Sequence, residues 1–217
     1  MVLEEALRPD APDTVRFLEA EGVQVKVISG DGVGTVQAVA AACGVTGAEN
    51  AIQGPDLPDD PEALREIVRT ETPFVGICFG HQLLAQALGG TVRKAAVGWG
   101  IGAKEYAVHA TKEWMDPPRE VIRLAASHQD QVIDMPADAT VWADSDYCPN
   151  GGMFVGERAW TLQVHPEFSP ALADSLLATR TALFGEEPAA AARATLTQAS
   201  LDQDLLARWM SAFFHGD

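Results

Sequence analysis

The stretch PFVGICFGHQLLAQALGG, residues 73–90, predicts a buried strand, a sharp turn and a helix in direct succession. The apolar run 74–77 has the length of one buried strand, and apolar residues recur at helical spacing over 83–88. Between them Cys78 lies in the pattern G-x-C-x-G, which is typical of the turn that lifts a nucleophile above the end of a sheet. We predict that Gly76 and Gly80 occupy positions where a Cβ atom would clash.

This turn would give Cys78 a specific chemical environment. It puts the thiol at the N-terminus of a helix, where unpaired N–H groups and the helix dipole favour the thiolate. It also leaves the backbone N–H of Phe79 available to bind a developing oxyanion. The alternative is that Cys78 is an inert packing residue, as most lone intracellular cysteines are.

A second motif, AWTLQVHPEF at residues 159–168, supplies a base for such a thiol. Its alternation predicts a strand with Gln163 and His165 on the same face, and Pro166 ends the strand directly after His165. The chain then turns, so that Glu167 can reach back to one imidazole nitrogen. A carboxylate on one nitrogen leaves the other to accept a proton from Cys78, which is the nucleophile, base and orienter arrangement of a triad.

The rest of the chain alternates between strand and helix patterns. Helices are predicted at 11–22, 35–43, 59–70 and 200–214, and strands at 2–6, 23–28, 121–127, 139–145, 151–156 and 159–165. The alanine-rich segment 185–198 is expected on the surface. The order of these elements predicts an α/β fold, in which helices flank a mostly parallel central sheet, an antiparallel region follows, and a helix ends the chain.

Composition excludes several classes of function. A formal net charge of −16 and a pI near 4.5 argue against nucleic acid or an anionic membrane as a partner. The start of the chain shows no targeting pattern and no long apolar run occurs, so we expect a cytoplasmic protein. Three widely spaced cysteines and the spacing of the histidines predict neither a disulfide framework nor a metal site.

Three segments, GICFGHQLLAQALGG, ASHQDQV and LQVHPEF, resemble the class I glutamine amidotransferases. This family includes the glutaminase domain of GMP synthetase and the stand-alone γ-glutamyl peptidases. The resemblance implies a flavodoxin-like catalytic domain over residues 1–185, with residues 186–217 as a helical extension packed on it. It implies no cofactor.

The resemblance also implies roles for the residues of these motifs. Cys78 would attack the side-chain amide carbon of glutamine, His165 would serve as base and then as acid, and Glu167 would orient His165. A γ-glutamyl thioester would form, ammonia would leave, and water would release glutamate.

Further residues are assigned by the same resemblance. Gln82 would contact the bound glutamyl group, and His128 and Asp130 would line the site, although a solvated turn explains these two equally well. The second oxyanion donor would be Gly54, in ENAIQGPD, where Gln53 replaces the first glycine of the family's Gly-Gly-Pro.

Three functions therefore remain open. The chain is a glutaminase that delivers ammonia to a separate synthase subunit, a γ-glutamyl peptidase that accepts larger leaving amines, or a non-catalytic binding or regulatory protein on the same fold. An ester-cleaving α/β-hydrolase shares the turn around Cys78, but its acid normally precedes the histidine well upstream, whereas here the carboxylate follows it.

Overall fold

The computed structural model of the chain describes residues 9–20, 22, 25, 27, 33–51, 65–66, 73–198 and 200–215. The strand predicted at 2–6 lies outside these residues, as do most of the strand at 23–28 and most of the helix at 59–70. The chain divides into two compact units, Met1–Asp60 and Pro61–Asp217. The two units are described separately.

The first unit contains two short helices and one turn of 3-10 helix. These elements are α1 (Ala11–Ala20), α2 (Val33–Cys43) and η1 (Ala48–Asn50). Gly22 and Gly44 follow the two helices with φ angles of 81° and 80°, a conformation that ends helices and that glycine adopts without strain. The backbone N–H of Thr46 donates to the Glu19 carboxylate at 2.9 Å, and this bond joins the segment after α2 to α1.

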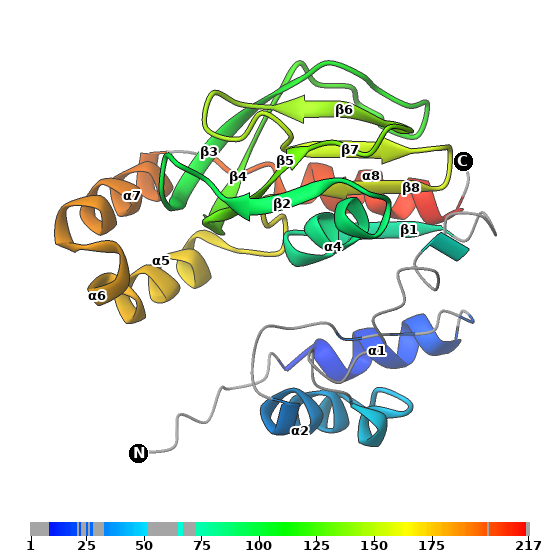
Figure 1. Ribbon diagram of the computed structural model, residues 1–217. Coiled ribbons are helices and arrows are strands. Elements are labelled where there is room, and N and C mark those ends of the chain that lie inside the picture. The colour runs from blue at the N-terminus through cyan, green and yellow to red at the C-terminus, as the bar shows by residue number, and fades with distance from the viewer. Residues whose placement is uncertain are drawn as a thin grey trace. The chain divides into compact units, whose positions relative to one another are not determined.

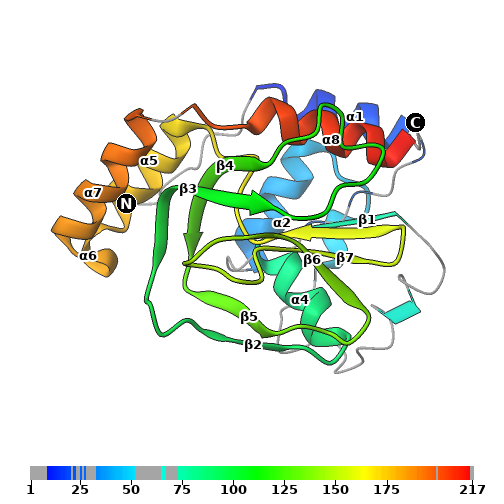
Figure 2. The ribbon, with the colours of Figure 1, turned by 90° about the horizontal axis from the view of Figure 1, so that it is seen from above.

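The second unit is built on a curled six-stranded sheet (Figure 1). Its order is β1-β8-β7-β6-β3-β4, and the bounds are β1 (Phe74–Ile77), β3 (Gly100–Val108), β4 (Val121–His128), β6 (Ala139–Asp144), β7 (Gly152–Val155) and β8 (Ala159–Leu162). A separate two-stranded sheet pairs β2 (Thr91–Lys94) with β5 (Asp130–Asp134), along the edge where α4 lies (Figure 2).

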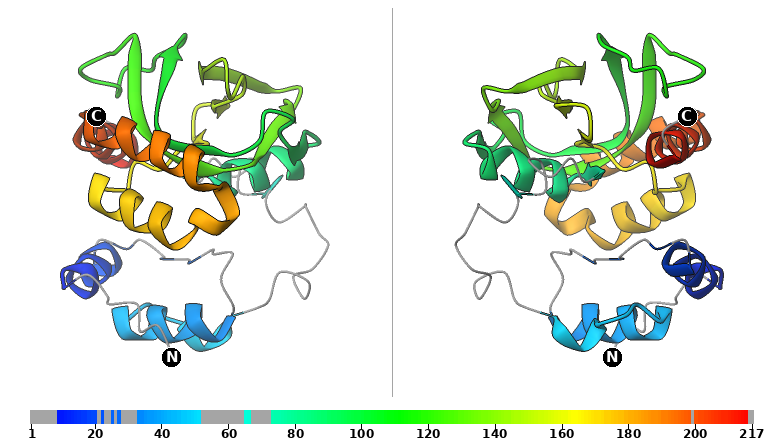
Figure 3. Two further views of the ribbon diagram at one scale, coloured as in Figure 1. Left: turned by 90° about the vertical axis from the view of Figure 1, so that its left-hand side faces the viewer. Right: turned by 90° about the vertical axis from the view of Figure 1, so that its right-hand side faces the viewer.

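The α/β class and the helix at the end of the chain are confirmed, but the expectation of a mostly parallel sheet is not met. Among the described strands, β1 and β8 pair in parallel, and the other neighbouring pairs of the large sheet are antiparallel. The reason lies in the connections, because only residues 156–158 separate β7 from β8, and a parallel pair needs a crossover of about a dozen residues. Figure 3 shows the curl of this sheet.

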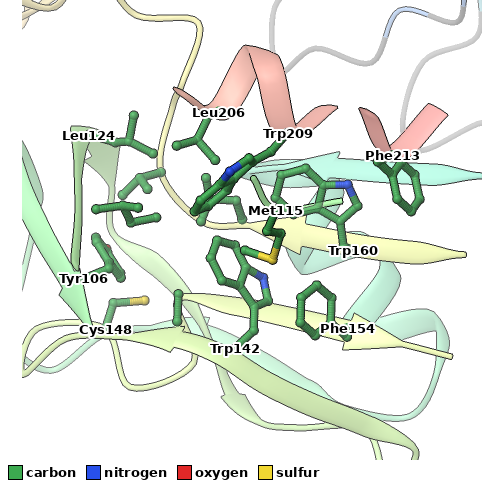
Figure 4. Packing of buried hydrophobic residues seen from close by; sticks show 14 of the residues in the cluster. Tyr106, Met115, Leu124, Trp142, Cys148, Phe154, Trp160, Leu206, Trp209 and Phe213 are labelled. Atoms are coloured by element: carbon green, nitrogen blue, oxygen red, sulfur yellow. The ribbon is translucent and has the colours of Figure 1, made fainter. Parts of the chain in front are cut away.

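Alternation along the central strands gives the sheet two apolar faces. On β8, Trp160 and Leu162 point toward α8 (Gln203–His215), whereas Ala159 belongs to the cluster formed with α4 (Phe79–Ala87). The larger core holds three fully buried tryptophans, Trp142, Trp160 and Trp209 (Figure 4). The elements that carry the predicted site are therefore fixed by packing on both sides.

Three further helices pack along β3. They are α5 (Pro170–Thr179), α6 (Thr181–Phe184) and α7 (Glu186–Gln198). The alanine-rich segment expected on the surface is α7, and its residues Ala189, Ala192 and Leu196 are buried. Small side chains permit this close approach: Gly102 of β3 lies so near that an added Cβ would be 2.8 Å from the carbonyl oxygen of Ala192. No helix within the described ranges is long and apolar enough to cross a membrane.

Candidate active site

Cys78 lies on a sharp turn between β1 and α4. Among the non-glycine residues that the structure describes, it alone has a positive φ, at 49° with ψ at −98°. Strained backbone of this kind persists only where its surroundings fix it, and it is concentrated at functional sites. Two hydrogen bonds fix it here: the N–H of Cys78 donates to the carbonyl of Leu162 at 2.8 Å, and the N–H of Gln82 donates to the carbonyl of Cys78 at 3.1 Å.

The two glycines of the motif differ in their surroundings. A Cβ on Gly76 would lie 2.8 Å from the carbonyl carbon of Gly80 and 2.8 Å from Cγ2 of Thr161, so the close approach of β1 to the start of α4 requires glycine. The prediction for Gly76 is therefore confirmed. It is wrong for Gly80, where a Cβ would meet no described atom within 4 Å, because this residue faces away from the sheet.

His165 lies just beyond the end of β8 and is held from three sides. Its backbone N–H donates to the carbonyl of Ala125 at 2.9 Å, which ties it to β4. Its ring stacks on Phe168, with centroids 4.0 Å apart and an angle of 8° between the rings. The carboxylate of Glu167 lies 2.6 Å from Nδ1. The side chain is mostly buried, with 13% of its surface exposed.

The charge state of His165 follows from these contacts. Burial lowers its pKa, but hydrogen bonds with Cys78 and with Glu167 outweigh burial and raise the pKa from 6.5 to about 9. The imidazolium is therefore the favoured form at neutral pH. With Nδ1 occupied by Glu167, the other ring nitrogen is the one available to the sulfur of Cys78, and a thiolate and an imidazolium stabilise each other in this arrangement.

A chain of side-chain amides leads to the same sulfur. Nε2 of Gln163 donates to Sγ of Cys78 at 3.6 Å. Nε2 of Gln82 donates both to Oε1 of Gln163, at 3.1 Å, and to the backbone carbonyl of Asp130, at 2.7 Å. Both hydrogens of the Gln82 amide are thus in use, which leaves only its oxygen for a ligand. The sequence analysis assigned no role to Gln163, although the alternation of the strand places it two residues before His165 on the same face.

His128 and Asp130 lie at the junction of β4 and β5. The side chain of Asp130 is exposed, while its backbone carbonyl accepts hydrogen bonds from Gln82 and, at 3.2 Å, from Nδ1 of His128. Burial lowers the pKa of His128 to about 4, so its ring is neutral near pH 7. Its Nε2 is buried and has no hydrogen-bond partner among the described residues. The ring meets Tyr147 edge-on, with centroids 5.5 Å apart.

The two predicted oxyanion donors have different standing. Phe79 is the first residue of α4, so its N–H belongs to the helical turn that has no intrahelical acceptor. Gly54 lies outside the described residues. Within the described ranges, no group of three or more His, Cys, Asp or Glu side chains is arranged to hold a metal ion.

Comparisons with known proteins identify similar sequences. The family model described as glutamine amidotransferase class-I matches residues 26–182. Gamma-glutamyl peptidase 3 of Arabidopsis thaliana is 28% identical, over 71% of this chain and 66% of that protein. The glutamine-hydrolyzing GMP synthase of Bacillus subtilis is 34% identical, over 52% of this chain but only 23% of the synthase.

A solved structure has a similar fold. The crystal structure of a glutamine amidotransferase from Thermotoga maritima covers 94% of this chain and 90% of its own, with a TM-score of 0.63 and 20% sequence identity. At this identity the likeness concerns the fold alone. The family match is what relates the chain to a group of enzymes.

Proposed function

Because this chain belongs to the class-I glutamine amidotransferase family, we propose that it is an enzyme that hydrolyses the side-chain amide of glutamine through a γ-glutamyl thioester on Cys78. The main support is the contact of His165 with both Cys78 and Glu167, since one imidazole bonded to a sulfur and a carboxylate is what acyl transfer by a cysteine needs. The strained turn around Cys78 adds to this support.

The first half of the reaction acylates the thiol. The thiolate of Cys78 attacks the γ-carbonyl carbon, a C–S bond forms, and the carbonyl electron pair moves to oxygen. The N–H of Phe79 and, in this proposal, that of Gly54 donate to the oxyanion, an interaction for which each donor contributes about 3 kcal/mol. The imidazolium of His165 then gives its proton to the nitrogen, the C–N bond breaks, and ammonia leaves.

The second half releases glutamate. The imidazole of His165, now neutral, takes a proton from water, whose oxygen attacks the thioester carbonyl. The C–S bond breaks, and the thiolate and the imidazolium are restored together. Glu167 stabilises the imidazolium at both stages and holds Nδ1, so that the opposite nitrogen stays directed at the reacting atoms.

We propose the junction of β4 and β5 as the substrate-binding edge of the site. The exposed carboxylate of Asp130 suits the α-ammonium group of a glutamyl substrate, and the free amide oxygen of Gln82 suits a donor on the same substrate. The neutral ring of His128 offers a nitrogen acceptor, which would need a small movement to reach a ligand because it is buried.

Two settings for this chemistry are favoured by the relatives. The similarity to a γ-glutamyl peptidase favours γ-glutamyl peptides as a second class of substrate. The match to 23% of a GMP synthase favours a glutaminase that supplies ammonia to a separate synthase chain.

Release of glutamate from glutamine and from a γ-glutamyl dipeptide tests the proposal. Turnover should disappear in Cys78→Ala and persist in the matched variant Cys43→Ala, which also loses a free cysteine but one outside the proposed site. Dipeptide turnover indicates a peptidase, whereas weak glutamine turnover that rises with an added synthase chain indicates an amidotransferase subunit. If wild type and Cys78→Ala behave identically, and a chloroketone analogue of glutamine does not label Cys78, the protein is a non-catalytic member of the family.

A further inference from the structure

The amide of Gln163 is enclosed completely, so its hydrogen bonds must be made within the protein. Its residue has 0% of its surface exposed, and its backbone N–H donates to the carbonyl of Gly151 at 2.8 Å. A buried primary amide without partners is costly. The partners of this amide are Gln82 on its oxygen side and Cys78 on its nitrogen side.

The orientation of the amide follows from a fixed acceptor. The backbone carbonyl of Asp130 can only accept a hydrogen bond, so the Gln82 group that lies 2.7 Å from it must be the NH₂. The same NH₂ lies 3.1 Å from the Gln163 amide, which must therefore present its oxygen. The NH₂ of Gln163 is then left facing Sγ of Cys78 at 3.6 Å. One backbone oxygen thus determines the direction of the whole chain of amides.

We propose that Gln163 is a catalytic residue that donates a hydrogen bond to the thiolate of Cys78, and that Gln82 is a positioning residue that holds Gln163 in the donating orientation. The inference rests on the proposed function, in which Cys78 is the nucleophile. It adds a second donor to the sulfur beside His165, on a different strand position and with no charge of its own.

The second donor has a role that the first cannot fill. During acylation His165 gives up its proton to the leaving nitrogen, so its positive charge is lost at the stage when the thiolate must later be expelled. The amide of Gln163 has no accessible protonation change, so its donor is present in both halves of the reaction. It stabilises the thiolate before attack and again when the thioester breaks, whereas the neutral sulfur of the thioester gains little from it.

The test is the pH dependence of Cys78 alkylation by iodoacetamide, followed by mass spectrometry of the Cys78 peptide. Gln163→Met keeps the length of the side chain and removes the donor. Because a hydrogen bond to a charged group is worth about a factor of ten or more, we expect the midpoint of the profile to rise by about one pH unit. Gln163→Glu should raise it further, since it directs an acceptor at the sulfur. Gln82→Met should move the midpoint in the same direction by less.

Gln131 offers a matched control. It is also a buried glutamine, 2% exposed, and its Nε2 donates to the carbonyl of Tyr147 at 3.1 Å. Gln131→Met and Gln131→Glu carry the same changes of side chain and should keep the wild-type midpoint. A midpoint for Gln163→Met equal to that of wild type, or a shift of equal size in Gln131→Met, overturns the inference.

A measurement on the wild-type protein removes dependence on how the variants fold. Alkylation of Cys78 should move the side-chain NH₂ resonances of Gln163 and leave those of Gln131 in place; unmoved Gln163 resonances overturn the inference. Neither experiment requires turnover. A protein that shows the shifts but hydrolyses no γ-glutamyl substrate would therefore refute the proposed function and leave the role of Gln163 toward the sulfur intact.

Discussion

Replacing Gly76 with alanine tests the close contact between β1 and α4 on which the turn at Cys78 depends. The added Cβ would lie 2.8 Å from the carbonyl carbon and 2.9 Å from the carbonyl oxygen of Gly80, and 2.8 Å from a methyl group of Thr161. Two of these three atoms are backbone, so rotation of a side chain cannot relieve the clash. Overpacking of this kind costs about 1–3 kcal/mol, and each kcal/mol lowers the melting temperature of a chain of this size by about 2–4 °C.

Gly80→Ala is the matched control from the same motif. No described atom lies within 4 Å of the added Cβ, and the residue is inside α4, where alanine is favoured over glycine by up to about 1 kcal/mol. Urea denaturation of both variants should therefore give changes in the free energy of unfolding of opposite sign. Equal destabilisation by the two substitutions, or a neutral Gly76→Ala, would refute the assignment of the close contact to Gly76 alone.

Three other outcomes can be checked by unfolding measurements. The pKa of His165 is raised from 6.5 to about 9, so its contribution to stability is full below pH 6.5 and is lost as the pH rises through about 9; His165→Asn should destabilise more below pH 6.5 than above pH 9, and an equal loss at both would contradict this. Trp209→Ala should cost about 3–5 kcal/mol, because this ring is fully buried, whereas Phe214→Ala, at a residue 53% exposed on the same helix, should stay within about 0.5 kcal/mol. Tyr147→Phe should cost about 1 kcal/mol in the same measurement, since its hydroxyl donates to the carbonyl of Gly98 at 2.9 Å; a neutral result would remove that bond from the account.

Features that depend on neighbouring residues were predictable from the sequence. The strand, turn and helix around Cys78 follow from a short apolar run, a glycine and helical spacing, and the structure has them at 74–77 and 79–87. The alternation of β8 likewise predicts that Trp160 and Leu162 share a buried face, as they do. Both features are set by local geometry, in which a period of two or of 3.6 residues decides the environment of each side chain.

Features that depend on distant segments were not predictable in this way. The direction of strand pairing in the large sheet is set by the connections between strands, and a pattern within one strand does not contain it. The amide chain at Cys78 joins Gln82, Gln163 and the carbonyl of Asp130, which are far apart in the sequence. The burial of α7 has the same origin, because alanines read as neutral by hydropathy become buried where a facing strand carries glycine.

The central claim is that the sulfur of Cys78 becomes covalently bonded to a γ-glutamyl group. The most direct measurement is acid quenching of the wild-type protein during turnover of glutamine, followed by mass spectrometry of the peptide that carries Cys78. The account predicts that this peptide gains the mass of one γ-glutamyl group, and that the peptides with the buried Cys43 and Cys148 do not. Glutamate release without any adduct on Cys78, or with the adduct on another residue, would contradict it.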